Sequence, residues 1–168
     1  MSFFSKLTDS LSDTFEIKSP AEDRIDAATS SDLSSPDWQL NMSLVDFINR
    51  SSQGTVELYG YLRRRLARSQ PQTVFLSLVL LETFIKNGRT HVLKVSAAQE
   101  TIDIIAELVQ NQDVEFKKVQ AKALALLYQW ALRFGPDSSF GLCLTDLKAK
   151  QIIKVPTSHK TPLKYVLG

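Results

Sequence analysis

The chain has 168 residues, of which 43% are hydrophobic, and a formal net charge of +2. This length suits one domain with a sizeable core. The near-neutral charge and the absence of a basic stripe with interleaved aromatic residues exclude a nucleic-acid-binding protein. The single cysteine, Cys143, excludes an intrachain disulfide, and no apolar run approaches the roughly 20 residues that span a bilayer. We therefore expect a cytoplasmic protein.

Helical periodicity runs through nearly the whole chain and predicts an all-α fold. An extra N-terminal amphipathic helix is expected in residues 1–18, with an apolar face of Phe4, Leu7, Leu11 and Phe15. The main domain is expected over residues 19–156 and a tail over residues 157–168. Its predicted helices cover residues 21–30, 36–50, 55–69, 71–87, 91–97, 99–110, 114–134 and 139–151. Helix ends are expected at Gly54, Gly88 and Gly135.

The helix predicted at residues 36–50 has two apolar faces, although one is enough for a core. The face expected toward the core carries Leu40, Leu44, Phe47 and Ile48. A second stripe, roughly 130° away, carries Trp38, Met42 and Val45. Either another part of the chain covers this second stripe, or it is a docking surface. The positions of these residues around the helix leave both alternatives open.

The helices at residues 71–87 and 114–134 are expected to build the core. The first is apolar around its first three turns, which is typical of a helix buried on several sides. The second has one apolar stripe that includes Trp130, so we expect this tryptophan in the core.

Sequence motifs of catalysis are missing. His91 and His159 have no partner at metal-ligand spacing, and neither a glycine-rich phosphate loop nor a G-x-S-x-G elbow occurs. Cys143 stands among apolar neighbours, where an inert buried thiol is expected. We therefore expect no enzymatic activity, no metal and no cofactor.

Several segments together resemble the VHS domain, an N-terminal module of adaptors that sort membrane cargo. They are DAATSSDLSSPDWQLNMSLVDFINRSSQG, LRRRL, LSLVLLETFIKNGRTHV, KALALLYQWALRF and LTDLKAKQIIKVP, which lie within about residues 21–156. The resemblance implies a right-handed superhelix of about eight helices, related to the ENTH domain. It also implies a non-enzymatic adaptor domain, peripherally associated with endosome or trans-Golgi membranes, whose partners include other trafficking proteins.

The resemblance implies weak binding of ubiquitin, or of ubiquitinated cargo, through the second helix and the start of the fourth. The corresponding residues here are Trp38, Met42 and Val45, with Asp37 before the tryptophan and Ser77 on the fourth helix. Thr73 and Ser77 are small enough for a partner to approach. An exposed stripe of this kind would complement the apolar interaction patch of ubiquitin.

Some sorting adaptors of the family bind acidic-dileucine peptides between their sixth and eighth helices, with basic and aromatic residues. The corresponding segment here, residues 95–109, has no Lys, Arg or Phe and carries Glu100, Asp103 and Glu107. Because these carboxylates would repel an acidic peptide, we expect no binding in this mode.

Two alternative functions remain open at this stage. ENTH relatives insert an N-terminal helix into phosphoinositide membranes, but here the polar face of that helix carries Asp9, Asp13 and Glu16 against one Lys6. The segment of residues 1–18 could instead pack on the domain, lie disordered, or bind as a helix in the groove of a partner protein. The other alternative is a purely structural or protein-interaction domain whose Trp38 stripe is covered by the chain itself.

An arginine cluster ends the third predicted helix and consists of Arg63, Arg64, Arg65 and Arg68. Cations at this position suit the negative end of a helix, so a solvated cap is the default expectation. A contact with acidic lipid headgroups or an acidic partner is the alternative.

Overall fold

The computed structural model describes residues 18–68 and 70–153. The predicted N-terminal helix with Phe4, Leu7, Leu11 and Phe15, the side chain of Arg68 and the C-terminal tail lie outside the described residues. Every regular element within them is helical. The elements are α2 (Pro20–Ala28), α3 (Trp38–Arg50), α4 (Ser52–Arg68), α5 (Pro71–Asn87), α6 (Thr90–Ser96), α7 (Gln99–Gln110), the 3₁₀ helix η1 (Val114–Phe116), α8 (Lys117–Phe134) and α9 (Ser139–Ala149). None of these helices is both long and apolar enough to cross a bilayer.

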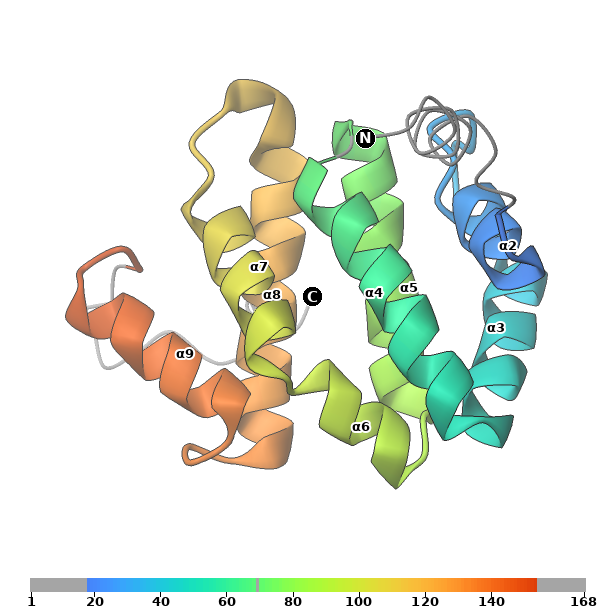
Figure 1. The fold of residues 1–168 in the computed structure, drawn as a ribbon. Coiled ribbons are helices and arrows are strands. Elements are labelled where there is room, and N and C mark those ends of the chain that lie inside the picture. Colours follow the sequence, from blue (N-terminus) through green and yellow to red (C-terminus); the bar gives the residue numbers. More distant parts are fainter. Residues whose placement is uncertain (1–17, 69, 154–168) are drawn as a thin grey trace, which may run out of the picture.

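The helices follow one another across the molecule in chain order (Figure 1). The helices α2 and α3 lie at one end, α4 and α5 in the middle, and α9 at the far end beyond α7 and α8. Neighbours in sequence pack together, as α3 does on α4 and α8 on α9. Helices further apart also touch, because α2 reaches α4 and α7 reaches α9. The fold is therefore a stepwise array of stacked helices.

The helix α5 is the central rod of the core, as its apolar sequence predicts. It contacts α2, α3, α4, α6 and α8. Leu78, Leu81 and Phe84 along its length are fully buried. Trp130 of α8 is 4% exposed, and its ring centre lies 5.2 Å from that of Phe140 in α9. The prediction that Trp130 belongs to the core is therefore confirmed.

Local capping sets several helix boundaries. At α2 the Ser19 hydroxyl accepts from the Glu22 amide while the Glu22 carboxylate accepts from the Ser19 amide, a reciprocal capping box. Gly135 ends α8 at a φ of 96°, which glycine adopts readily. The expectation of a helix end at Gly54 was wrong. The break falls at Ser51, whose Oγ accepts a hydrogen bond of 2.9 Å from the Gly54 amide inside the first turn of α4.

Candidate partner-binding site on the first turns of α3

Two large apolar side chains are exposed at the start of α3. Trp38 has 59% of its surface exposed and Met42 has 44%, whereas Trp130 has 4%. Because residues four apart are neighbours on a helix surface, the two form one contiguous patch. Within the described residues, no helix covers Trp38 or Met42. Coverage by the N-terminal segment lies outside the described residues.

Asp37 fixes the start of this helix. Its Oδ1 accepts a hydrogen bond of 3.0 Å from the Leu40 amide, and its carbonyl accepts one of 2.9 Å from the Asn41 amide. Its own backbone is extended, so Trp38 is the first helical residue. A capped helical turn, and not a free loop, thus sets the direction of the Trp38 side chain.

The loop before α3 is tied to α5 by a residue that sequence reasoning missed. Gln72 Nε2 donates a hydrogen bond of 2.8 Å to the Leu33 carbonyl. The two residues are 39 positions apart, and a glutamine after the proline that opens α5 carries no sequence signal for such a contact. The bond holds the connection that leads into Trp38.

Val45 is buried, with 3% exposed, contrary to the expectation that it shares the open stripe. Around the helix it lies only about 20° from Trp38, but it is almost two turns further along. Val45 belongs to the hydrophobic core, and one turn beyond it Asn49 ties α3 to the end of α5 by donating to the Asn87 carbonyl over 3.1 Å and accepting from the Arg89 amide over 2.8 Å. The same side of α3 is thus covered at Val45 and open at Trp38.

Ser77 and Thr73 on α5 are also buried, with 0% and 5% exposed. Ser77 Oγ donates a hydrogen bond of 2.7 Å to the Thr73 carbonyl one turn earlier. The expectation that these residues face a partner was wrong, because α5 is enclosed by other helices. Their small size serves close helix packing.

Arg65 joins α4 to the end of α2. Its Nε donates to Thr29 Oγ1 over 2.9 Å, and its Nη2 donates to the Thr29 carbonyl over 3.3 Å. Its Nη1 lies 3.4 Å from Asp26 Oδ1. The guanidinium therefore satisfies acceptors at the carboxyl end of α2. The expectation of a solvated cap on α4 was wrong for Arg65.

The neighbouring arginines differ in exposure. Arg63 Nε donates to Thr101 Oγ1 over 3.0 Å and so ties α4 to α7. Arg64 has 69% of its side chain exposed, and its Nη2 lies 3.9 Å from Glu22 Oε1. Of the arginines in this cluster whose side chains are described, Arg64 is thus the most accessible to a partner.

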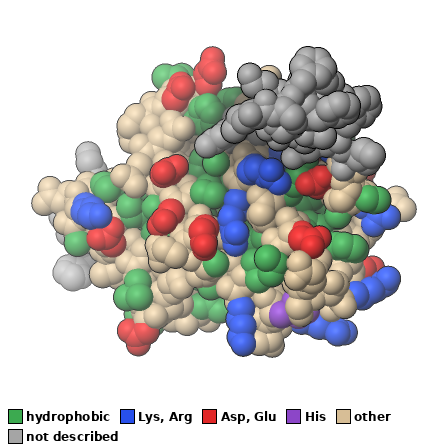
Figure 2. All heavy atoms as spheres, in the orientation of Figure 1, with side chains coloured by type: hydrophobic (Ala, Val, Ile, Leu, Met, Phe, Trp, Pro, Cys, Tyr) green, Lys and Arg blue, Asp and Glu red, His purple; other side chains and the backbone are tan. Residues whose placement is uncertain are grey.

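A hollow of about 310 Å³ between α7 and α9 has an acidic lining. The lining residues are Gln99, Ile102, Asp103, Ala106, Ser139, Leu142, Cys143 and Asp146. They include no Lys or Arg, and Figure 2 shows acidic side chains gathered over α7. That acidic-dileucine peptides do not bind stays a prediction, and this lining supports it.

Cys143 in this hollow is half-buried rather than fully buried. Burial, and then the charges of Asp146 and Asp103, raise the pKa of its thiol. The thiol therefore stays protonated at neutral pH and is a weak nucleophile. His91 lies elsewhere, with its Nε2 2.8 Å from the Ile48 carbonyl of α3. Among the described residues no cluster of His, Cys, Asp or Glu has the arrangement of a metal site.

Comparison with known proteins gives the family. The family model of the VHS domain matches residues 16–151. TOM1-like protein 1 of Arabidopsis thaliana is 30% identical over 126 residues, which cover 75% of this chain and 30% of that protein. Vacuolar protein sorting-associated protein 27 of Yarrowia lipolytica is 31% identical over 143 residues, which cover 82% of this chain and 25% of that protein. Target of Myb1 membrane trafficking protein of Mus musculus is 33% identical over 125 residues, which cover 71% of this chain and 25% of that protein.

The chain thus spans between 25% and 30% of the length of these relatives. Among solved structures, the VHS and FYVE tandem domains of Hrs, a protein involved in membrane trafficking and signal transduction, match with a TM-score of 0.72 at 23% identity. The match covers 86% of this chain and 66% of that one. It confirms the predicted all-α superhelical fold. Since the family model covers most of the sequence, the chain belongs to the VHS domain family.

Proposed function

We propose that this domain works in membrane trafficking by binding ubiquitin on cargo weakly, through the exposed Trp38 and Met42 of α3. The observation that carries the proposal is the exposure of these two side chains, 59% and 44%, on a capped helical turn. A tryptophan supplies a large apolar surface and a methionine adapts its shape to a partner. Two adjacent exposed apolar side chains at one helix end support a small contact surface for a partner.

The names of the relatives support the trafficking role. One is a membrane trafficking protein and another is associated with vacuolar protein sorting. We propose by analogy that this protein acts at the cytoplasmic side of endosome or trans-Golgi membranes, with other trafficking proteins as partners. The cargo would then be selected by several weak contacts together.

The contact should be weak, because two exposed side chains offer little area. We expect a Kd of hundreds of micromolar, or roughly −5 kcal/mol. Such an affinity is useful when several ubiquitins or several binding modules act together, since linked sites raise the effective concentration. Val45 and Ser77 are buried, so the proposed contact surface excludes them, while Asp37 acts by holding the helix start.

Membrane binding through the arginine cluster has less support. Arg63 and Arg65 are engaged with Thr101 and Thr29 inside the domain. Using them for lipid headgroups would break those hydrogen bonds. Insertion of the N-terminal helix into phosphoinositide membranes stays a prediction, since its residues lie outside the described part of the chain.

The test is a titration of the isotope-labelled domain with ubiquitin, followed by NMR. We expect shifts at the Trp38 indole and the Met42 methyl, and none along α7. Trp38→Ala and Met42→Ala should each weaken binding about tenfold, as for a buried anchor of an interface. Leu132 is 69% exposed on α8, so Leu132→Ala is the matched control and should bind normally. Absence of shifts at millimolar ubiquitin would reject the proposal and leave the fold intact.

A further inference from the structure

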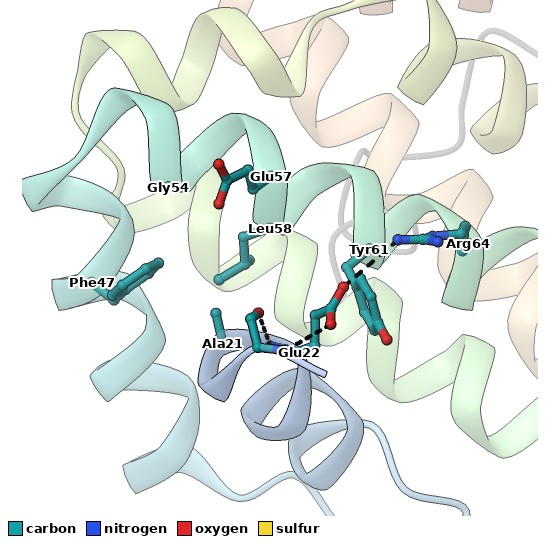
Figure 3. Close-up of a pocket in the computed structure, with 9 residues that line it drawn as sticks. Ala21, Glu22, Phe47, Gly54, Glu57, Leu58, Tyr61 and Arg64 are labelled. Atoms are coloured by element: carbon teal, nitrogen blue, oxygen red, sulfur yellow. Dashed lines mark hydrogen bonds and ion pairs between the residues drawn. The ribbon is translucent and has the colours of Figure 1, made fainter. Parts of the chain in front are cut away.

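A second hollow, here called the α2–α4 pocket, lies away from Trp38. Its volume is about 370 Å³, at the lower end of the roughly 300–1,000 Å³ typical of ligand pockets. The first turn of α2 faces one side of α4 across it, and Phe47 of α3 stands at one end (Figure 3). The lining residues are Ser19, Ala21, Glu22, Phe47, Gly54, Glu57, Leu58, Tyr61 and Arg64. Phe47 lies about 180° from Trp38 around α3, so the two surfaces are separate.

Gly54 lets α4 pack closely on the Phe47 ring at one end of the pocket. A Cβ atom at this position would lie 3.1 Å from two atoms of the Phe47 ring and 3.2 Å from Ser51 Oγ. Any larger side chain here would grow into the space beside the ring. The glycine thus serves the packing of α4 on α3, while the partly exposed Phe47 ring and the exposed Glu57 both border the pocket.

The charges of the pocket favour a positively charged ligand, because its two carboxylates outnumber its one guanidinium. Glu22 is already engaged: one oxygen accepts from the Ser19 amide over 2.8 Å and the other lies 3.9 Å from Arg64 Nη2. Among the described residues, Glu57 accepts a single hydrogen bond, of 2.9 Å from Gln53. No described lysine or arginine forms an ion pair with Glu57.

We propose that the α2–α4 pocket receives an arginine side chain of a partner protein. Its guanidinium would pair with Glu57 beside the Phe47 ring. The domain already makes this kind of contact at the other end of the pocket, where the Arg64 guanidinium carbon lies 4.5 Å from the centre of the Tyr61 ring. Arginine is favoured over lysine because a planar guanidinium both stacks on a ring and binds a carboxylate with two donors.

The same charges disfavour other occupants. Residues 1–17, which precede the pocket-lining Ser19 in the sequence, carry Asp9, Asp13 and Glu16 against one Lys6. Glu22 and Glu57 would repel such an acidic segment, and they would repel an anionic lipid headgroup in the same way. A basic segment of a second protein is therefore the occupant that the lining selects.

The test uses the isotope-labelled chain of residues 1–168 and two small probes that differ in charge. N-acetylarginine amide carries the guanidinium, and N-acetylcitrulline amide has nearly the same shape without the charge. We expect the amide signals of Gly54, Glu57 and Leu58 to shift with the arginine probe. The citrulline probe should bind about five- to tenfold more weakly, the size expected for losing one ion pair and one cation–ring contact.

Two glutamate variants separate the pocket from general ionic attraction. Glu57→Gln should weaken arginine binding by a similar factor, whereas Glu100→Gln, at an exposed carboxylate of α7, should leave it unchanged. Trp38→Ala should also leave it unchanged, which keeps this test independent of ubiquitin binding. Equal binding of both probes, equal effects of both glutamine variants, or shifts spread evenly over α7 would overturn the proposal. Because Glu57 is exposed, Glu57→Gln should fold, and unchanged signals outside the pocket verify this.

Discussion

Arg65 and Thr29 hold α4 against the end of α2 through a guanidinium–hydroxyl hydrogen bond of 2.9 Å. Thr29 is 0% exposed, and its hydroxyl in turn donates 2.7 Å to the Ile25 carbonyl. The chain of bonds thus runs from α4 into the last turn of α2, whose carbonyls lack helical partners. The arginine-rich end of α4 therefore stabilises the fold at Arg65.

Replacing Arg65 should destabilise the domain. Arg65→Ala leaves the buried acceptors of Thr29 without their donor, so we expect a loss of about 2 kcal/mol in the free energy of unfolding. Arg64→Ala is the matched control, since its side chain is 69% exposed and should cost less than about 0.5 kcal/mol. Urea unfolding followed by circular dichroism measures both. Equal losses for the two variants would contradict the role assigned to Arg65.

Two glycines should respond in opposite directions to alanine. A Cβ at Gly60, within α4, would meet no atom within 4 Å, whereas one at Gly141 in α9 would lie 2.4 Å from the Gly135 carbonyl oxygen. Gly60→Ala should therefore stabilise the domain by about 0.5–1 kcal/mol, through the lower flexibility of the unfolded chain. Gly141→Ala should lower the thermal midpoint because backbone must move. If both variants raised the thermal midpoint, or both lowered it, the difference in free space around Gly60 and Gly141 would be contradicted.

Tyr59 should make the domain sensitive to alkaline pH. Its side chain is fully buried and shares a hydrogen bond with Ser96 Oγ. Burial raises the pKa of Tyr59 above its usual value of 10.0, while Ser96 and Arg63 act in the opposite direction. Above pH 10 the Tyr59 hydroxyl is deprotonated in the unfolded chain but stays protonated in the folded chain. The contribution of Tyr59 to the free energy of unfolding is therefore fully present below pH 10 and declines as the pH rises above it.

The expected decline is up to about 1.4 kcal/mol per pH unit from this group. Tyr59→Phe should lose about 1 kcal/mol at neutral pH, since Ser96 Oγ keeps its bond to the Val92 carbonyl. It should nevertheless lose less stability than the parent chain between pH 9 and pH 11. Urea midpoints at both pH values test this. Parallel declines in the two proteins would rule out Tyr59 as the group that titrates.

The helices could be predicted from the sequence wherever proline and glycine residues mark the same helix ends as the hydrophobic periodicity. The predicted bounds of α5 and α7 match the structure: Pro71 is the first residue of α5 and Gly88 follows its last one, as expected. The sequence pattern predicts the start of α4 three residues late, because a glycine such as Gly54 is typical of a helix end. The actual break, at Ser51, contains neither proline nor glycine and depends on a side-chain cap.

The site followed from the sequence only in part. A helical wheel gives the angle of a side chain around α3, and it grouped Val45 with Trp38 correctly in that respect. The wheel does not show how far along the α3 axis the neighbouring helices extend. That extent is the reason why 3% of the Val45 surface is exposed but 59% of the Trp38 surface. The contacts of Arg65 and Gln72 join residues 36 and 39 positions apart. No local pattern encodes such pairs.

Asp37 should couple the stability of α3 to ubiquitin binding. Asp37→Ala removes the side-chain acceptor of the Leu40 amide, which should cost about 1 kcal/mol of stability. Because Trp38 is the first helical residue, fraying of this turn should also displace its indole and weaken binding severalfold. Asp37→Ser keeps a capping oxygen and should preserve both properties.

The matched control for this prediction is Asp46→Ala, which removes an exposed carboxylate of the same helix outside its first turn. If Asp37 acted only through its charge, Asp37→Ser would weaken ubiquitin binding as much as Asp37→Ala. If it acts by capping, Asp37→Ser and Asp46→Ala should both bind like the parent chain. Salt dependence separates the two further, because a cap within one helix turn is screened less than a long-range attraction to ubiquitin. Retained affinity in Asp37→Ala, despite the lost stability, would show that the Trp38 indole does not depend on the cap.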